Sequence, residues 1–368
     1  MTLTTGVELE LWVVDQYGNL SDGRHVADAH DRIEPEFVPP LLEAQTEPRA
    51  SEAALRRDLQ EVLRAAIRKA EIRDQHLVPL GTPLTAAAAD ADTERGRLFE
   101  RIYGDGVRSA KNCAGTHVHF EKGDPLEQLN LLTAVDPALA LVSTSPYYCG
   151  EGVRSSARAH AYRRKCGADF HEFCELWKYA DSLGEWRRRV DDAYESFKAL
   201  AAERGVSPGT VEEHFEPEDT VLNPVRLREC QPTVEWRAPD AALPSEVLQL
   251  ATDVRRLVEE TEDKPVEVGA PGVYDDHIGV PEYPTLCGLS RAAINFGLEP
   301  TPVREYLDRL GFDSSAYDPL SPKIAGPKQV SESEARRIRL EQATRFETDV
   351  ATLTRPEASP RTTPNEEV

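Results

Sequence analysis

The chain has 368 residues, of which 40% are hydrophobic, enough to bury a sizeable core in one large domain. Its formal charge of −22, from 65 acidic against 43 basic residues, argues against a nucleic-acid partner and against adhesion to an anionic membrane. The basic residues are 34 arginines and nine lysines, and an acidic, lysine-poor surface suits a salt-rich cytoplasm in which charge repulsion is screened. We therefore expect a halophilic source, with an ordinary acidic protein as the alternative.

Cysteine usage and targeting patterns narrow the cellular setting. The six cysteines are scattered without C-x-x-C spacing, which fits neither a zinc framework nor a disulfide scaffold. The N-terminus has no basic segment followed by an apolar run, and the most apolar stretch, 131–145, is too short to span a bilayer. We therefore expect a cytoplasmic protein.

The first readable element is a strand over 6–15, which carries two glutamates at alternating positions. Because side chains alternate across a strand, Glu8 and Glu10 project from one face while Leu9 and Leu11 pack on the other. Like charges this close repel each other. Taken alone, the pair fits a solvated outer face as well as it fits a metal site.

Hydrophobic period and capping signals predict the remaining elements. In chain order they are a short strand after the turn at 15–19, an extended segment at 37–49, helices at 51–73, 126–142, 169–179, 183–204, 245–260 and 331–353, and strands at 76–80, around His117 and at 233–237. We expect one α+β domain over 1–354, with helices packed against a mainly antiparallel sheet and a helical insert at about 169–230. The tail, 355–368, is rich in Pro, Thr and Glu and is predicted to be disordered.

The alternating spacing of ionisable groups recurs in two later strands, which carry His117 with His119 and Glu235 with Arg237. Three such strands can build one face of a sheet, and with Glu47 they predict a site of hard oxygen ligands with one histidine. Carboxylates this dense repel in a low-dielectric cleft unless divalent cations neutralise them. Mg²⁺ or Mn²⁺ suits such ligands better than zinc, and a metal site beside arginines suits phosphoryl transfer from a nucleotide.

Five motifs carry a family resemblance. They are Gly6-Val7-Glu8-Leu9-Glu10, Leu42-Glu43-Ala44-Gln45-Thr46-Glu47, Gly115-Thr116-His117-Val118-His119, Ser145-Pro146 with the Arg-rich segment behind it, and Val234-Glu235-Trp236-Arg237. In order and spacing they resemble the glutamate-cysteine ligase type 2, or carboxylate-amine ligase, family of the glutamine synthetase superfold. The resemblance covers about 5–260 and, with the acidic composition, suggests a haloarchaeal member.

The resemblance implies a fold in which an antiparallel sheet forms a funnel with helices on its outer face, ATP at one mouth, the acceptor amine at the other and Mg²⁺ between. It implies a reaction in which ATP converts the γ-carboxylate of glutamate to an acyl phosphate, which an amine, expected to be cysteine, converts to an amide. By the same resemblance, the metal ligands are Glu8, Glu10, Glu47, His117 and Glu235. Arg237 is implied to steady the transferred phosphoryl group, and Arg158 to receive the carboxylate of the acid substrate.

Several alternatives stay open. The segment 151–154 stands where many family members have Asp-Thr-Gly, so the resemblance says least about the acid-substrate pocket. One rival function is a metal-dependent amide hydrolase in which His117 and His119 hold zinc, and another is a non-catalytic nucleotide-binding relative. Glu43 could lie at the edge of the site or at a solvated position. His119 is expected to support a metal ligand rather than to bind the metal itself. The sequence is also compatible with a homo-oligomer.

Overall fold

The structure, a computed structural model, describes residues 3–85, 93–104, 110–165, 173–220, 222–229 and 231–354. The predicted disordered tail, Cys166, Cys230 and the first part of the helix predicted at 169–179 lie outside the described residues.

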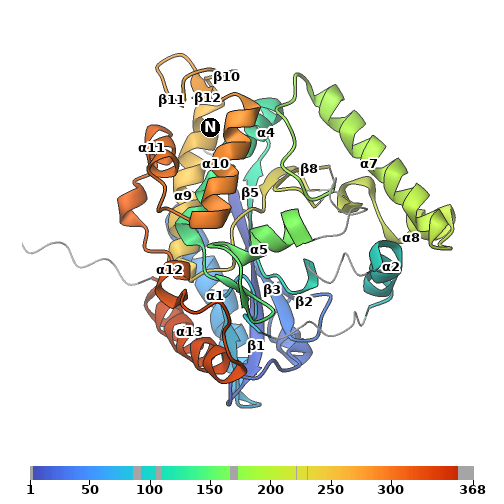
Figure 1. The fold of residues 1–368 in the computed structure, drawn as a ribbon, viewed down its shortest axis with the longest axis vertical. Coiled ribbons are helices and arrows are strands. Elements are labelled where there is room, and N and C mark those ends of the chain that lie inside the picture. Colours follow the sequence, from blue (N-terminus) through green and yellow to red (C-terminus); the bar gives the residue numbers. More distant parts are fainter. Residues whose placement is uncertain are drawn as a thin grey trace, which may run out of the picture.

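A seven-stranded antiparallel sheet organises the chain (Figure 1). Its strands are β1 (Thr5–Asp15), β2 (Ile33–Pro35), β3 (Leu41–Gln45), β4 (Gln75–Val78), β5 (Thr116–Glu121), β8 (Val225–Arg228) and β9 (Thr233–Trp236). Their spatial order is β2-β3-β1-β5-β9-β8, and β4 pairs with the end of β1. The long central strand β1 therefore has neighbours along its whole length. β8 lies within the segment predicted as a helical insert and belongs to this sheet.

The two faces of the sheet differ in chemistry because the residues of each strand alternate between them. In β1, Val7, Leu9 and Leu11 are buried in the main core, and the same face continues through Val118 and Trp236 of the neighbouring strands. The opposite face carries the ionisable residues. The alternation read from the sequence of β1 is thus confirmed.

Helices cover the apolar face. Ser51 caps α1 (Glu52–Glu71) by accepting from the backbone N–H of Ala54, as its position predicts. This helix packs on β1, β3 and β4, while α4 (Pro125–Ala134) packs on β8 and β9, and α9 (Pro244–Glu260) packs on β1 and β5. Further helices are α5 (Ala157–His160), which continues as a π-helical turn to Lys165, α10 (Tyr283–Phe296), α11 (Thr301–Arg309), α12 (Ser321–Ile324) and α13 (Glu332–Thr352). Short strands form two small sheets, β6 (Tyr147–Tyr148) with β7 (Glu151–Gly152), and β10 (Val266–Val268), β11 (Gly272–Val273) and β12 (Ile278–Val280).

A second, smaller core lies beside the sheet. Helices α2 (Glu94–Tyr103), α7 (Leu183–Glu203) and α8 (Pro208–His214) meet around aromatic rings on the right of Figure 1. The rings of Phe99 and Tyr103 pack edge to face at 4.8 Å, and Phe99 stacks on Phe37, which follows β2. The aromatic core therefore touches the edge of the polar sheet face.

Three predicted elements differ from the structure. The strand expected after the turn at 15–19 is a single bridge between Val14 and Leu20. The helix expected over 126–142 ends at Ala134 and continues as a 3₁₀ helix because Pro137 cannot donate the next backbone hydrogen bond. The described part of the segment at 169–179 contains turns and coil, since Phe173 packs in the aromatic core while Trp177 packs against the main one.

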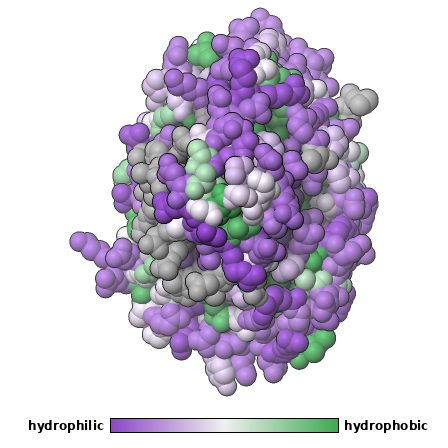
Figure 2. Space-filling model, turned by 90° about the vertical axis from the view of Figure 1, so that its right-hand side faces the viewer, coloured by the Kyte–Doolittle hydropathy of each residue, from purple (hydrophilic) through white to green (hydrophobic). Residues whose placement is uncertain are grey.

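The surface agrees with the composition. The face in Figure 2 is covered mostly by hydrophilic residues, and apolar residues show as small separate patches. No helix in the part of the chain that the structure describes is long and apolar enough to cross a membrane.

Replacing Asp136 by alanine is expected to lower the free energy of unfolding by about 3–5 kcal/mol, because it leaves a buried guanidinium without its counter-charge. The Asp136 carboxylate is fully buried and accepts two hydrogen bonds from Arg163, at 2.8 and 2.5 Å. Urea denaturation measures the loss. The control, Glu334→Ala, breaks an exposed pair with Arg337 and is expected to cost far less, because exposed ion pairs contribute little to stability; equal losses in the two variants would contradict the prediction.

Candidate active site

The polar face of the sheet brings ionisable residues from six strands into rows. Pairing places Glu10 opposite Glu43, Glu8 opposite His117, and His119 opposite Glu235. Arg226 of β8 lies opposite Glu235 and ends the row. Carboxylates therefore gather on β3 and β1, histidines on β5, and arginines on β8 and just after β9.

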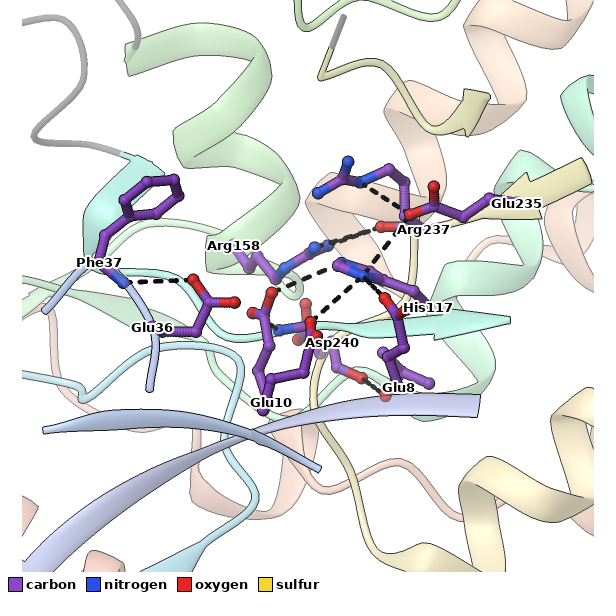
Figure 3. A network of polar contacts seen from close by, with 12 residues as sticks. Glu8, Glu10, Glu36, Phe37, His117, Arg158, Glu235, Arg237 and Asp240 are labelled. Atoms are coloured by element: carbon purple, nitrogen blue, oxygen red, sulfur yellow. Dashed lines mark hydrogen bonds and ion pairs between the residues drawn. The ribbon is translucent and has the colours of Figure 1, made fainter. Parts of the chain in front are cut away.

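Glu8 is the centre of the acidic side (Figure 3). One of its oxygens lies 2.9 Å from Nδ1 of His117, and the other lies 3.1 Å from Nε2 of His119. Burial raises the pKa of the Glu8 carboxyl, but the hydrogen bonds to the two histidines outweigh burial and hold its pKa well below the usual range. Glu8 is thus a carboxylate with oxygens directed to both sides.

Three sets of side chains are arranged to hold a metal ion, each with its ligand atoms within 4.8 Å of one another. The sets are Glu8, Glu43 and His117; Glu8, His119 and Glu235; and Glu10, Glu36 and Glu43. Carboxylates dominate all three, as hard cations such as Mg²⁺ and Mn²⁺ prefer. The residues present therefore fit a row of divalent cations in which Glu8 and Glu43 each belong to two sets.

The acidic side holds more negative charge than it can neutralise by itself. Burial and the neighbouring charge of Glu10 raise the pKa of the Glu36 carboxyl to about 7. Burial, followed by the charges of Glu8, Glu36 and Glu10, raises the pKa of Glu43 well above its usual range. A divalent cation between these groups would remove both the repulsion and the reason for the raised pKa values.

Arginines neutralise the buried carboxylate of Glu235 on the other side of this sheet face. Glu235 is fully buried and accepts two hydrogen bonds from Arg226, each 3.0 Å long. The nearest Glu235 oxygen is 3.7 Å from Nε of Arg237, and burial of this carboxyl is outweighed by the Arg226 and Arg237 charges, so its pKa lies well below the usual range. Among the described residues, the buried Nη1 of Arg237 has no hydrogen-bond partner, which leaves a donor available for an anion.

Arg158 reaches the site from α5 and ties two segments together. Its guanidinium donates to the backbone carbonyls of Arg237, at 3.2 Å, and Ala238, at 3.0 Å. The side chain passes against Gly115, where an added Cβ would lie 2.2 Å from Nη2 of Arg158. The start of α5 is held by Asp240, which accepts from the hydroxyl of Ser156, the N-cap residue. Arg158 therefore braces the backbone that carries Arg237.

The structure brings six of the seven predicted site residues together. Glu8, Glu10, His117, Glu235, Arg158 and Arg237 meet as described, whereas Glu47 lies on the exposed stretch after β3 and belongs to none of the three metal-compatible sets. The backbone N–H of Glu47 donates to Asp58, which turns the chain toward α1. The ligand role of Glu47 stays a prediction.

Two residues of the site escaped sequence reasoning. Glu36 follows β2 in a short loop without alternation, and its signal was only the acidic character of 34–36. Arg226 precedes Glu235 by nine residues. Prediction of a hairpin between two short strands would have placed Arg226 beside Glu235. Glu43, which the sequence left open, lies in the acidic cluster.

Changing Gly115 to alanine is expected to lower the free energy of unfolding by about 1–3 kcal/mol, because the new Cβ would displace the buried Arg158 guanidinium from its two carbonyl partners. Thermal and urea unfolding measure the effect. The matched control is Gly288→Ala on α10, where a Cβ meets no atom within 4 Å among the described residues and alanine favours a helix. An unchanged Gly115→Ala protein would contradict the close packing.

The stability of metal-free protein is expected to depend on pH through Glu36. Its pKa is raised from 4.5 to about 7 in the folded chain, so folding favours the protonated form, and this contribution is lost as pH rises from about 4.5 through 7. Urea unfolding should show that the free energy of unfolding of Glu36→Gln, relative to wild type, rises by up to about 3 kcal/mol from pH 5 to pH 8. The figure follows from about 1.4 kcal/mol per pKa unit. A difference between Glu36→Gln and wild type that stays constant over this pH range would refute the argument.

Comparison with known proteins now places the fold. No protein-family model matches the chain, and no curated protein matches its sequence. Among solved structures, the chain is similar to a bifunctional glutathione synthetase from Pasteurella multocida, with a TM-score of 0.56 and 15% identity over 96% of this chain and 49% of that one. It is also similar to a glutamate–cysteine ligase from Francisella tularensis in complex with AMP, with a TM-score of 0.51 and 13% identity over 96% of this chain and 92% of that one.

The chain shares the fold of these two proteins. It spans about half the length of the Pasteurella protein. The predicted α+β architecture, with helices on a mainly antiparallel sheet, is confirmed. The funnel shape stays a prediction.

Proposed function

We propose that the chain is an ATP-dependent carboxylate–amine ligase that works with divalent cations. The observation that carries the proposal is the division of one sheet face into an acidic side around Glu8 and Glu43 and a cationic side around Arg226 and Arg237. Cations on one side and arginines on the other suit a triphosphate laid across the face. Two structures with this fold are those of ligases, and one of them is in complex with AMP.

The acidic side would hold Mg²⁺ or Mn²⁺. The ligands would come from Glu8, Glu10, Glu36, Glu43, His117, His119 and Glu235. When bound, such ions neutralise phosphate charge and orient the phosphoryl group for in-line transfer. Burial and the nearby Arg237 charge lower the pKa of His117, which favours the neutral imidazole that a cation requires.

The arginines would act on the transferred group. Arg237 has a buried donor without a partner among the described residues, and Glu235 fixes the position of its guanidinium, so it can bind phosphoryl oxygens as the γ-carboxylate attacks. Arg158 already donates to two carbonyls, and its buried Nε is the donor left for a substrate carboxylate. Arg158 thus combines the predicted acid-binding role with support of the Arg237 backbone.

We propose glutamate as the acid and cysteine as the amine, following the motif resemblance. The acyl phosphate of glutamate would form by attack of its γ-carboxylate oxygen on the terminal phosphorus of ATP, with ADP leaving. The amine nitrogen would then attack the acyl carbon, phosphate would leave and the nitrogen would lose a proton. The segment 151–154, exposed around β7, lies near the start of α5 and is where substrate choice would differ from the family pattern.

The test is ADP release by the purified full chain with ATP, Mg²⁺ and pairs of amino acids, in low and molar salt. We expect release only when glutamate and an amine are both present, with cysteine the best amine. Zinc-stimulated amide hydrolysis without ATP would favour the hydrolase, and nucleotide binding without turnover on any pair would favour the non-catalytic relative. Either result would overturn the proposal.

A further inference from the structure

An open cavity lies apart from the acidic cluster. It has a volume of about 400 Å³ and is bordered by α5, its π-helical continuation, the segment 175–176 and α10. None of the clustered glutamates and histidines lines it among the described residues, although Arg163 also borders a much smaller space beside Arg158. Its size falls in the range of small-molecule sites.

The wall of the cavity is rich in arginine, although the chain as a whole is acidic. Arg154, Arg163 and Arg291 contribute three guanidinium groups, whereas the chain as a whole carries −22. Asp136 neutralises Arg163, so the positive charges available to a ligand are those of Arg154, just before α5, and Arg291 on α10, beside the negative charge of Glu175. A concentrated positive charge in an acidic protein favours an anion.

A buried hydroxyl also points to a ligand. Ser290 lines the cavity at 3% exposure, and its Oγ has no hydrogen-bond partner among the described residues. Buried polar atoms in native proteins are nearly always paired, so an unpaired one at a cavity wall indicates a group that is bound there. Arg291, the next residue of α10, also lines the cavity, so the wall carries a hydroxyl and a cation.

We propose that this cavity is a second ligand site, which binds a small amino acid or dipeptide through its carboxylate. Arg154 and Arg291 bind the carboxylate, and the Ser290 hydroxyl donates to it. Glu175 supplies negative charge on the same wall for the ammonium group, and Leu176 and Ile294 contact the aliphatic part. The site uses no metal and no nucleotide, so the proposal stands apart from the proposed ligase activity.

Calorimetric titration of the metal-free full chain, without ATP, tests the site. The probes are L-glutamate, glutarate, which lacks the ammonium, and 1,5-diaminopentane, which lacks the carboxylates. We expect saturable binding of L-glutamate, weaker binding of glutarate and none of the diamine. Saturable binding of the diamine, or no saturable binding of L-glutamate, would overturn the proposal.

Variants locate the binding. Arg291→Gln is expected to weaken L-glutamate binding by about 10-fold or more, and Ser290→Ala severalfold, because each removes a hydrogen bond to the carboxylate. Arg309→Gln, at an exposed position of α11, is the matched control and should bind as wild type does. Arg158→Gln removes the arginine proposed to receive the substrate carboxylate, and it should keep binding at the second site. L-Glutamate binding that is lost in Arg158→Gln and kept in Arg291→Gln would assign the ligand to the proposed active site and refute the second site.

Discussion

Replacing Arg237 by glutamine is expected to lower the turnover number for ADP release by about 1000-fold, with a smaller change in the KM for ATP. An arginine that binds the phosphoryl group in transfer contributes most when charge is redistributed over the phosphoryl oxygens, which is why its loss affects kcat more than binding. The buried Nη1 of Arg237 is placed for such a contact. Steady-state measurement of released ADP at saturating glutamate and amine separates the two constants.

The variant should remain folded, which keeps the prediction testable. Glu235 retains its two hydrogen bonds from Arg226 and its proximity to Arg228 at 3.5 Å, so no carboxylate is left buried without a counter-charge. Arg237→Lys preserves the charge and loses the bidentate geometry, and we expect it to recover a minor part of the lost rate. A kcat within tenfold of wild type in a folded Arg237→Gln protein would exclude the proposed role.

The sequence predicted the elements whose patterns are local. β1 alternates apolar and acidic residues over 7–11, and α1 begins at a serine cap followed by apolar residues at helical spacing, so both were found with accurate boundaries. It missed helices α10 and α11, although each has a proline in its first turn and α11 has a clear apolar face. The strands of the small sheet β10-β12-β11 are two or three residues long, and so short a run shows no period in the sequence.

The site residues also divide into those that local spacing predicts and those that depend on tertiary contacts. Glu8 and Glu10 must share a face because they share a strand, whereas the approach of Glu36 depends on the loop after β2 and on the register of β2 against β3. A shift of one residue in register would turn Glu43 to the apolar face. Glu47 shows the limit of spacing arguments, since β3 ends at Gln45 and the alternation ends with it.

The order of charge across the sheet also explains how so many ionisable groups are buried together. The histidines of β5 lie between the carboxylates of β1 and Glu235 of β9, and Arg226 and Arg237 meet Glu235 from beyond. Each strand thus faces a neighbour of opposite or neutral character, except at Glu43, which pairs with Glu10 of β1 and with Glu34 of β2. The unbalanced carboxylates lie where the raised pKa values are found, and that is where we place the cations.

Replacing Glu8 by glutamine is expected to lower ADP release by more than about 100-fold and to remove most of the thermal stabilisation that Mn²⁺ gives the wild-type chain. Substitution of a group that only orients a metal ligand lowers activity or metal affinity by about 10–100-fold. Glu8 is a candidate ligand in two of the three sets, so its loss should exceed that range. The reason is that an amide carries no charge to offset the cation. Activity assays and melting temperatures with and without Mn²⁺ measure the two effects.

Two further substitutions, one on β2 and one after β3, sharpen the test. Glu34→Gln removes a carboxylate opposite Glu43 that belongs to none of the three sets, so both activity and metal-dependent stabilisation should match wild type. Glu47→Gln decides between the ligand role implied by the motif and the exposed position in the structure, which predicts a change of less than about threefold. If Glu8→Gln kept its activity while Glu47→Gln lost it, the metal centre would have to be moved to the loop after β3, because Glu8 would then be a partner of His117 and His119 alone.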